Sequence, residues 1–487
     1  MPNWNELRGA ITKGEVLMPC DDGYAASLKR WSAAAEMKAV SLTPLIYQSH
    51  VQLSPFQAVI VRPTCAEEVS VAVKFAVANK LPLAVCGGGH STSGMSSSEG
   101  MVIHLGNMRK VEVDQAKMTV SFDGGCLWSD VDSALDACGL ATVGGTVNHT
   151  GVGGLILGGG HGWLTAKYGL TIDNLISAQI VIADGSILEA SELQHPDLFW
   201  TIRGAGAQIG VVTRFTSRVY SQGQVWSGTL TFLPAKLPEL VAFANEFHNR
   251  DQRDGHCLTI VVGYTPDGAD RILSAIPLYH GPEWEARGYF ANLFSIGPIV
   301  DCTSMMCIAQ VNTLQNPMCE YGMRRLQGSG NVTMPLHTAA FQQTADTIWS
   351  IHDMHPDVRF CSLLVEIFPT HKLREVSQGA TAYANRGEFY DAVTTFGWTN
   401  PALDDAVRLC NSKLCAKIRR DNGYEWLGRA DSRDKPVGRY LNMEAEFVMP
   451  RQAYGWNLEK LQKTKSKFDP ENIFDKWHGV VEEMGEA

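Results

Sequence analysis

The hydrophobic pattern between residues 56 and 86 changes period twice, and each change marks a new element. Residues 56–63 form a nearly continuous apolar run, which predicts a buried strand. Apolar residues then recur at helical spacing up to residue 77, and Thr64 with Glu67 forms a capping-box pattern at the start of this helix. Residues 83–86 are apolar again and predict a second strand. The sequence therefore predicts a β-α-β unit.

The next segments continue this mixture of strands and helices. Residues 101–105 predict another strand, and residues 131–138 predict a helix that ends at Gly139. Residues 176–182 form a further apolar run, and the Asp-Gly pair within residues 183–186 is typical of a hairpin turn. A mixed α/β arrangement is therefore expected for the first half of the chain.

A glycine cluster with one histidine lies between two of the predicted strands. It reads Cys86-Gly87-Gly88-Gly89-His90-Ser91-Thr92-Ser93-Gly94. Such a segment places several backbone N–H groups on one concave surface, which binds anions and most often a diphosphate. His90 adds a nucleophilic side chain to this surface. A histidine in a glycine turn is equally often a solvated or packed residue, so the segment alone leaves both interpretations open.

A second glycine-rich block covers residues 143–164, and a third glycine turn at residues 203–210 leads into a strand. Few helices or strands are expected at such a glycine density, because glycine loses the most backbone entropy on folding. The glycines alternate with apolar residues, which is unlike a flexible linker. The block is instead typical of backbone that approaches a flat ligand closely.

The order of these motifs resembles a known family. GGGHS at residues 87–91, the second glycine block, YGL-DN at residues 168–174, a Tyr-x-Asn strand at residues 440–442 and KFDPENIF at residues 467–474 follow one another along the chain. This series is similar to the vanillyl-alcohol-oxidase superfamily of FAD enzymes, and most similar to its berberine bridge enzyme-like branch. The resemblance is strong at both ends of the chain and weak in the middle.

The resemblance implies an α+β fold in two lobes. We expect a peripheral helical segment at residues 1–54 and a PCMH-type FAD-binding domain of two small α/β subdomains at residues 55–221. A substrate-binding domain at residues 222–436 should hold an antiparallel sheet covered by helices, such as one predicted at residues 235–247. Residues 437–487 should return to the FAD domain. A chain of 487 residues is too long for a single core, which agrees with this division.

The resemblance also implies how FAD is held. His90 matches the family histidine that bonds covalently to the 8α carbon of the flavin. The other residues expected at the cofactor are Cys86, Gly87, Gly88, Gly89, Ser91, Gly94, Thr146, Thr150, Gly151, Gly153, Gly154, Leu155, Gly158, Gly210, Val212 and Asn442.

Three positions depart from the family pattern. Many relatives attach the flavin a second time through a cysteine, but Val147 stands at that position here, so we expect one histidyl link and no cysteinyl link. Thr150 replaces a branched apolar residue that gates oxygen in relatives, which leaves oxidase and dehydrogenase behaviour both open. Leu155 replaces a histidine near the pyrimidine end of the flavin.

The candidates for the chemistry come from three separate segments. His161 is a possible general base, because imidazole titrates near neutral pH. Asp391, on a strand predicted at residues 388–396, and Tyr440, on the expected Tyr-x-Asn strand, could each take a proton or orient a substrate. Glu366 is a weaker candidate on another strand. For each of them ordinary packing or solvation is the competing interpretation, and His149 is expected to be structural.

Composition narrows the range of partners. The formal net charge of −10 argues against nucleic acid or an anionic membrane surface, and no apolar run reaches the length of a membrane span. The 12 cysteines show no zinc-like spacing, so no metal is expected; Cys302 with Cys307, and Cys410 with Cys415, fit either core residues or disulfides. The N-terminal residues lack the features of a secretory signal, so we expect a cytoplasmic protein, with a secreted one as the alternative if a leader was removed.

We therefore expect an FAD-dependent oxidoreductase that takes a hydride from an alcohol, an amine or an activated C–H of a small organic substrate. Oxygen or another electron acceptor would reoxidise the flavin. The sequence leaves the oligomeric state open. The missing cysteine favours a natural-product substrate over a sugar, with a carbohydrate oxidase as an alternative. A non-redox cyclase or isomerase that uses FAD as a scaffold, and a flavin-binding protein without turnover, are two further interpretations that the sequence leaves open.

Overall fold

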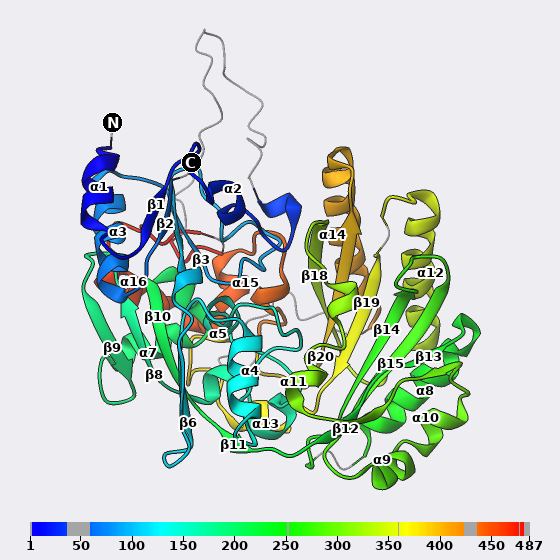
Figure 1. Cartoon of the computed structure of the whole chain (residues 1–487). Coiled ribbons are helices and arrows are strands. Elements are labelled where there is room, and N and C mark those ends of the chain that lie inside the picture. Colours follow the sequence, from blue (N-terminus) through cyan, green and yellow to red (C-terminus); the bar gives the residue numbers. More distant parts are fainter. Residues whose placement is uncertain are drawn as a thin grey trace.

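The computed structural model describes residues 2–36, 59–250, 253–358, 360–422, 436–476 and 478–481. Two lobes lie side by side (Figure 1). The first lobe contains the N-terminal part of the chain and the C-terminal helices, and the second contains most of the chain between them. The short yellow helix α13 (His371–Glu375) is an exception, because it packs against the first lobe (Figure 1). The α+β fold expected from the resemblance is confirmed.

The first sheet contains the predicted β-α-β unit. Its strand order is β1 (Glu15–Leu17), β2 (Val59–Arg62), β4 (Met101–His104) and β3 (Leu83–Cys86), and β4 pairs in parallel with both β2 and β3. Helix α3 (Ala66–Ala78) connects β2 to β3. The buried faces of these elements pack on one another, so the hydrophobic period predicted this unit correctly.

Two details at the edge of this sheet correct the sequence-based expectations. The N-terminal segment, expected to be helical, also contributes the strand β1, which pairs antiparallel with β2. The expected capping box of Thr64 with Glu67 is wrong, because Glu68 accepts hydrogen bonds from the backbone N–H and the hydroxyl of Thr64 (2.9 and 3.0 Å). Glu68 also accepts from the N–H groups of Lys13 and Gly14, so it links the N-terminal segment to α3.

The second sheet is antiparallel. Its order is β5 (Val111–Asp114), β6 (Thr119–Asp123), β10 (Val211–Arg218), β8 (Leu175–Val181) and β9 (Ile187–Ser191). Strands β8 and β9 form the predicted hairpin, with Gly185 at φ +80° in its turn. Helix α4 (Trp128–Asp136) confirms the predicted helix, and Gly139 follows it with φ +65°.

The second glycine block contains a helix, contrary to expectation. Helix α5 (Val152–Leu157) includes Gly153 and Gly154, and it buries Val152 and Ile156. A Cβ on Gly153 would lie 3.0 Å from the carbonyl oxygen of Gly124. The packing of α5 close to this backbone outweighs the entropy that glycine loses in a helix.

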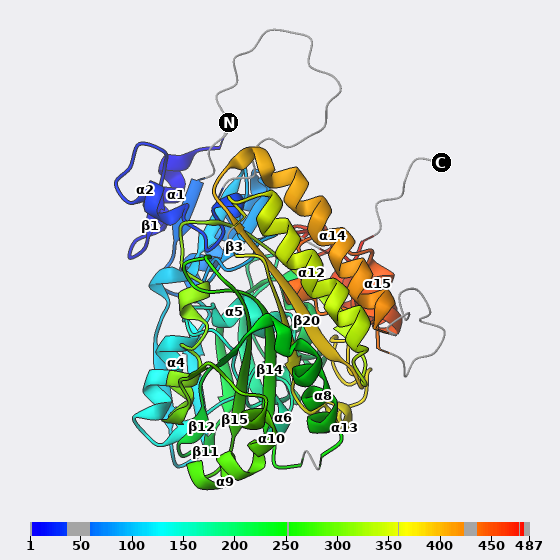
Figure 2. The ribbon, with the colours of Figure 1, turned by 90° about the vertical axis from the view of Figure 1, so that its right-hand side faces the viewer.

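The third sheet forms the second lobe and is antiparallel at every pairing of its described strands. Its order is β16 (Val300–Asp301), β13 (Leu230–Phe232), β15 (Arg271–Tyr279), β14 (Cys257–Tyr264), β19 (Ser362–Ile367), β20 (Tyr390–Trp398) and β18 (Arg324–Val332). Strand β12 (Val225–Ser227) also pairs with β15, and β17 (Ser304–Met306) pairs with β12. Helices α8 (Leu237–His248), α12 (Thr338–Met354) and α14 (Asp404–Asp421) cover one face, and α12 and α14 run side by side across it (Figure 2). Helix α8 and strand β20 confirm the elements predicted at residues 235–247 and 388–396.

Alternation along the strands separates the two faces of this sheet. On β19, Leu363 and Val365 are buried in the core under the helices, whereas Leu364 and Glu366 line a cavity. On β15, Leu273 and Ala275 belong to the core, and the residues between and beside them line the cavity. A sheet face that is not covered by helices is thus turned toward the first lobe.

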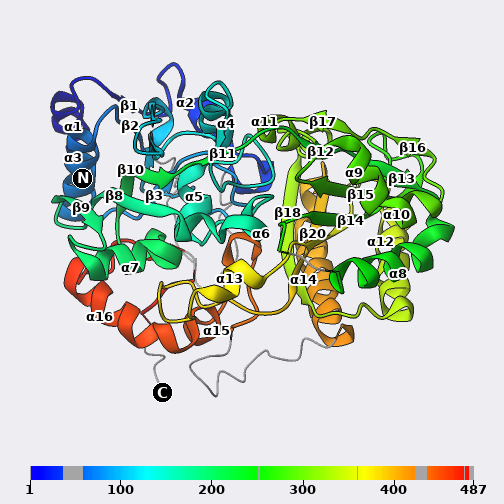
Figure 3. The same ribbon diagram turned by 90° about the horizontal axis from the view of Figure 1, so that it is seen from below.

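The C-terminal segment returns to the first lobe, where α16 (Leu458–Phe468) packs against α7 (Pro196–Ala205) (Figure 3). The buried Lys465 ammonium donates to Asp469 (2.6 Å) and to the carbonyl oxygens of Gln208 (2.8 Å) and Phe474 (2.7 Å). This connects the KFDPENIF segment to the glycine turn that precedes β10.

The Tyr-x-Asn segment is not the expected strand. Residues Leu441–Met443 form a single 3-10 turn, closed by a hydrogen bond from the Met443 N–H to the carbonyl oxygen of Tyr440. The side chain of Asn442 donates to the carbonyl oxygen of Leu155 (2.9 Å) and to the hydroxyl of Tyr440 (2.9 Å). These local bonds favour a turn, because the asparagine side chain forms hydrogen bonds that compete with the backbone pairing of a strand.

The remaining elements are short. They are α1 (Trp4–Ala10), α2 (Tyr24–Ser27), β7 (Leu140–Ala141), α6 (Thr165–Tyr168), β11 (Tyr220–Ser221), α9 (Glu283–Tyr289), α10 (Ala291–Ser295), α11 (Ile308–Val311), α13 (His371–Glu375) and α15 (Pro450–Tyr454). Within the described ranges, the helices lack the combination of length and apolarity needed to cross a bilayer. All 12 cysteines are free thiols, including the two pairs for which the spacing allowed a disulfide.

Candidate functional site

One large cavity lies between the lobes, with a volume of about 650 Å³. The first lobe contributes both glycine segments to its wall, and the second lobe contributes the uncovered face of the third sheet. The volume is in the range of ligand and cofactor pockets, which is roughly 300–1,000 Å³. Residues far apart in the sequence therefore share one cavity.

The two glycine segments touch each other at the first-lobe wall. A Cβ on Gly88 would lie 2.4 Å from the backbone nitrogen of Gly151, and a Cβ on Gly151 would lie 2.3 Å from the nitrogen of Gly88. A Cβ on Gly154 would meet no atom within 4 Å. Some of these glycines therefore allow two backbones to pack together, whereas Gly154 leaves space at the cavity, as a flat ligand requires.

Most of the expected cofactor residues line this cavity. They are Gly87, Gly88, Gly89, His90, Ser91, Thr146, Thr150, Gly151, Gly153, Gly154, Leu155, Gly158, Gly210, Val212 and Asn442. Cys86 is instead buried in a small apolar cluster behind the first sheet, and Gly94 supplies a turn at φ +83°. A glycine-lined wall with a histidine and several hydroxyl groups fits the diphosphate and flat ring of FAD.

His90 is held by aromatic neighbours. Its ring stacks on Trp31, with centroids 4.3 Å apart and an angle of 9° between the planes. Its Nε2 lies 2.9 Å from Nδ1 of His149, and the ring of Tyr321 lies edge-on to His90 and tilted against His149. Burial lowers the pKa of His90 well below its usual value, and His149 and the Arg325 guanidinium lower it further. At neutral pH His90 is therefore an uncharged imidazole, which is the nucleophilic form.

The stacking partner of His90 is itself fixed. The Trp31 indole N–H donates to the carbonyl oxygen of Cys319 (2.7 Å), and the Trp31 backbone N–H donates to the carbonyl oxygen of Gly89 (3.0 Å). The buried guanidinium of Arg325 lies over the Trp31 ring, 5.1 Å from its centroid. No sequence pattern pointed to Trp31, because the N-terminal segment that contains it was expected to be peripheral and away from the site.

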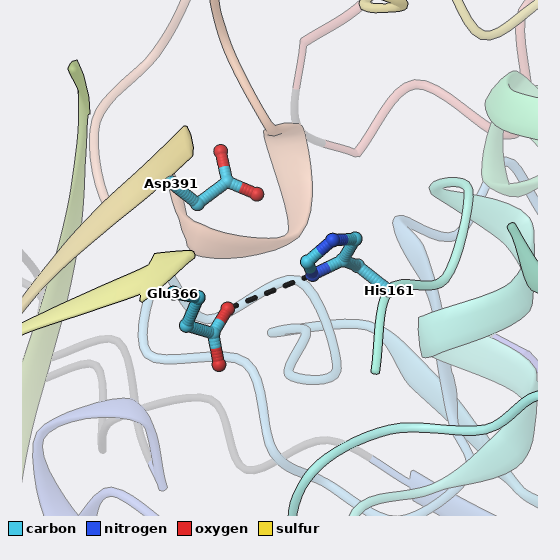
Figure 4. A group of neighbouring side chains, drawn as sticks. All are labelled: His161, Glu366 and Asp391. Atoms are coloured by element: carbon cyan, nitrogen blue, oxygen red, sulfur yellow. Dashed lines mark ion pairs between the residues drawn. The ribbon is translucent and has the colours of Figure 1, made fainter. Parts of the chain in front are cut away.

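A second group of side chains meets at the other wall. His161, Glu366 and Asp391 point toward one another from different elements (Figure 4), with ligand atoms within 4.8 Å of one another. Nδ1 of His161 lies 3.6 Å from Oε2 of Glu366. His161 follows α5 in the first lobe, and the two carboxylates belong to β19 and β20 of the second lobe. The lobes therefore complete this cluster together.

Strand register explains why the carboxylates meet. Glu366 is the direct antiparallel partner of Asp391, and Asp391 is the partner of Asn331 on β18. Asn331 donates from its side-chain nitrogen to Oδ1 of Asp391 (3.0 Å). Like charges opposite each other destabilise a sheet, so this pair is unusual for a structural position.

The charges of the cluster perturb one another. Burial works against a charged His161, but the Glu366 and Asp391 carboxylates outweigh it and raise the pKa of His161. Burial raises the pKa of Asp391 to about 6, a rise that the His161 charge opposes and Glu366 reinforces. Groups with such shifted pKa values in a cleft are typical of functional sites. The three ligand atoms are also close enough to share a divalent cation as well as a proton.

Two tyrosines lie beside this cluster, and one of them, Tyr440, lines the cavity. Tyr440 lies with its ring centroid 6.4 Å from that of His161, and burial raises its pKa, so it stays a neutral phenol. Tyr383 lies edge-on to Tyr440 and also fills the space beside Gly159. Tyr383 is in an irregular segment, and its role in the site was not foreseen from the sequence.

The wall between these groups is mainly apolar. From the uncovered sheet face and the loops beside it come Val261, Tyr264, Ile272, Ile276, Phe360, Leu364 and Val393. Val393 lies two residues after Asp391 on β20, on the same face. The cavity thus combines one cluster of charge with a large hydrophobic surface.

Comparison with known proteins agrees with this geometry. A family model described as an FAD binding domain matches residues 57–191, and one described as berberine and berberine like matches residues 439–480. The FAD-linked oxidoreductase pgmH of Aspergillus terreus is 35% identical over 492 residues, which cover 98% of this chain and 95% of that protein.

Two solved structures share the fold. They are 6-hydroxy-D-nicotine oxidase from Arthrobacter nicotinovorans (TM-score 0.77, 24% identity, 97% of this chain and 98% of that chain) and glucooligosaccharide oxidase from Acremonium strictum (TM-score 0.74, 20% identity, 98% of each chain). With a relative of this identity along nearly its whole length, the protein belongs to the FAD-linked oxidoreductases of the berberine bridge enzyme-like family.

Proposed function

We propose that this enzyme oxidises a small, largely apolar organic molecule at an alcohol, amine or activated C–H carbon, with FAD held by a single covalent bond to His90. Bound FAD would accept the hydride and pass the electrons to oxygen or another acceptor. The protein supplies the binding surface, the position of the substrate and a group that accepts the accompanying proton. The observation that carries this proposal is the cluster of His161, Glu366 and Asp391, because His161 and Glu366 line the same cavity as His90 and Asp391 lies directly beside them.

The proton acceptor in this proposal is His161. Its Nδ1 faces the Glu366 carboxylate, so the imidazolium that forms when it takes a proton is stabilised by a neighbouring negative charge. Asp391 adds a second charge at the same place and is itself held by Asn331. Tyr440, kept neutral by burial, can donate a hydrogen bond to the substrate oxygen or nitrogen.

The walls of the cavity support an apolar substrate. The surface of the cavity is mainly apolar, although Ser274, Ser362 and Thr395 add hydroxyl groups to its second-lobe side. An oligosaccharide would need hydrogen-bonding partners for most of its hydroxyls, which a mainly apolar surface supplies poorly. One structural neighbour is an oxidase of a nicotine derivative, and another is an oxidase of an oligosaccharide. The apolar lining favours a substrate closer to the first in polarity.

A single tether is supported by the residues beside the flavin site. In the glucooligosaccharide oxidase of Acremonium strictum, the FAD is attached through both a cysteinyl and a histidyl bond. In this chain His90 lines the cavity and so does Val147, whose side chain cannot attack carbon. His90 is therefore the residue proposed for the bond.

The first test asks whether the flavin is tethered. The wild-type protein is precipitated with acid, and flavin should stay with the His90 peptide identified by mass spectrometry. The same treatment of His90→Ala should release all flavin. Release of all flavin from the wild type would refute the tether.

The second test asks for redox chemistry. The protein is mixed without oxygen with a panel of apolar aromatic alcohols and amines, and an oligosaccharide panel serves as the contrast. Bleaching of the flavin by members of the first panel is expected, with slower bleaching in His161→Gln than in His337→Gln, which removes an exposed imidazole instead. A substrate that is converted while the flavin stays yellow would refute oxidation in favour of a non-redox reaction. A chelator should leave bleaching unchanged, which separates proton transfer from metal chemistry at the cluster.

A further inference from the structure

The hydrogen bond between His90 and His149 gives the second histidine a chemical role. His149 was expected to be structural, but its Nδ1 lies 2.9 Å from Nε2 of His90, and the ring centroids are 4.9 Å apart. Burial lowers the pKa of His149, as it does that of His90, and Arg325 lowers both further. Two neutral imidazoles at this distance share one N–H, which one ring donates and the other accepts.

We propose that His149 is the base for the attachment of flavin to His90. This inference rests on the proposed tether. Nε2 of His90 is engaged with His149, so Nδ1 is the nitrogen that bonds to the flavin. As that bond forms, Nδ1 becomes positively charged unless the ring loses its other proton. In the tautomer of His90 that carries its proton on Nε2, this N–H donates to Nδ1 of His149, 2.9 Å away, and His149 is therefore placed to take the proton.

Bonds, protons and electrons balance in this step. The bond between Nδ1 of His90 and the 8α carbon forms, and one C–H bond of the 8α methyl group breaks. The proton of that C–H and the proton from Nε2 of His90 both leave, the latter to His149. The two electrons of the broken C–H bond stay on the flavin ring and then reduce dioxygen, which takes two protons and becomes hydrogen peroxide. One peroxide should form for each tether.

The loop that carries His149 is fixed on both sides. The backbone N–H of Asn148 donates to the carbonyl oxygen of Asn312 (2.9 Å), and its side-chain oxygen accepts from Asn316 (3.0 Å). The backbone N–H groups of Ser129 and Trp128 donate to the carbonyl oxygens on either side of His149 (2.7 and 3.0 Å). A base held in this way needs no rearrangement before it accepts a proton.

The other face of His90 cannot supply a base. Trp31 covers it in parallel stacking, and the indole N–H already donates to the carbonyl oxygen of Cys319. Tyr321 lies edge-on to His90, 6.5 Å between ring centroids, and burial raises the pKa of its phenol, so it holds its proton at neutral pH. His149 is thus the group around His90 with both the position and the lone pair to take the proton.

The experiment measures tether formation rather than turnover. Full-length wild type, His149→Gln, His149→Ala and the control Tyr321→Phe are produced under riboflavin limitation and then incubated with FAD in air. Acid-stable flavin is measured over time, and flavin absorbance before acid treatment reports total binding. His149→Gln should bind FAD but form the tether on the order of 100-fold more slowly. Tyr321→Phe should form it at the wild-type rate.

Added imidazole separates a base from a packing role. It should speed tether formation in His149→Ala and leave the wild type unchanged, and NMR of the flavin peptide should show attachment at Nδ1. Tethering at the wild-type rate in both His149 variants would overturn the proposal, as would attachment at Nε2. Absence of acid-stable flavin in the wild type would instead refute the tether itself, so the two failures are distinct.

Discussion

The Glu366→Gln substitution tests the link between the carboxylates and His161 most directly. Glutamine keeps the shape of the side chain and removes its charge, and Asp391 stays in place. Nδ1 of His161 lies 3.6 Å from the Glu366 carboxylate. Coulomb's law at an effective dielectric constant of about 20 gives about 4.6 kcal/mol for unit charges at this distance, equivalent to roughly three pKa units. This is the upper limit of the shift.

The direction of the change in the His161 pKa follows from the protonation state of His161 that the Glu366 carboxylate stabilises. Glu366 favours the imidazolium, so its neutralisation must lower the pKa of His161. Burial, which disfavours the charged ring, is then opposed only by the Asp391 carboxylate among the causes that act on His161. We therefore expect the pKa of His161 to be lower in Glu366→Gln than in the wild type.

The measurement needs no substrate. Histidine labelled with ¹³C at the ring carbon between the nitrogens gives NMR signals that titrate with pH, and the His161→Gln variant identifies the signal of His161. Glu388→Gln, which neutralises an exposed carboxylate near the start of β20, is the control and should leave the titration in place. An unchanged His161 pKa in Glu366→Gln would refute the proposed coupling. With a substrate, the rise of activity with pH should move to lower pH, and its plateau should fall because the base is weaker.

Three further substitutions have defined outcomes. Asp391→Asn should raise the free energy of unfolding relative to wild type, by an amount that grows from pH 4 to 7 and reaches at most about 3 kcal/mol. The reason is that burial raises the pKa of Asp391 from 3.8 to about 6, so the stability of the wild type is full below pH 3.8 and falls as the pH rises through 6. A difference between the two proteins that stays constant with pH in urea titrations would contradict this. Arg386→Met should lower the free energy of unfolding by about 3–5 kcal/mol, because the largely buried Asp173 carboxylate loses its charged partner and the two hydrogen bonds of 2.7 and 2.9 Å that Arg386 donates, and keeps only the bond from the Leu170 N–H. Addition of Asp173→Leu should restore most of this loss in urea titrations. Gly151→Ala should yield protein with little bound flavin in absorbance spectra, because the new Cβ would lie 2.3 Å from the nitrogen of Gly88, and full flavin content would contradict that packing.

The local parts of the fold could be predicted from the sequence because their signals are local. The hydrophobic period located α3 and the strands around it, and the Asp-Gly turn located the hairpin of β8 and β9. The same kind of reasoning failed at α5, since glycine density describes the entropy of the free chain but not the packing energy of the folded one. It also failed at Asn442, where a side-chain hydrogen bond to Leu155 decides the conformation.

The glycine-lined wall of the cavity could also be predicted, because most of its residues fall within a few short sequence motifs. His90 and its neighbouring glycines form one motif, and the cavity places them together. The surroundings of His90 could not be inferred. Trp31 comes from the N-terminal segment and Arg325 from β18, and only the folded chain brings them to the same imidazole.

The chemical cluster depends on a register that no local pattern contains. Glu366 and Asp391 become partners only when β19 and β20 pair with the alignment that the structure shows, and a shift by one residue would turn one of them to the helix-covered face. Each carboxylate taken alone is more often a solvated residue, which is why Glu366 was a weak candidate.

The same register explains why the two lobes and the chemistry depend on each other. Two carboxylates directly opposite on a sheet destabilise it, and burial between the lobes increases that penalty because water no longer screens the charges. His161 reaches the pair from the first lobe and supplies the positive charge or shared proton that offsets the repulsion. Packing of the two lobes against each other thus buries the two carboxylates and also places the His161 imidazole beside them. In the proposed reaction, a proton transferred from the substrate to His161 would add positive charge beside the two carboxylates, so the arrangement would favour the protonated state of the cluster.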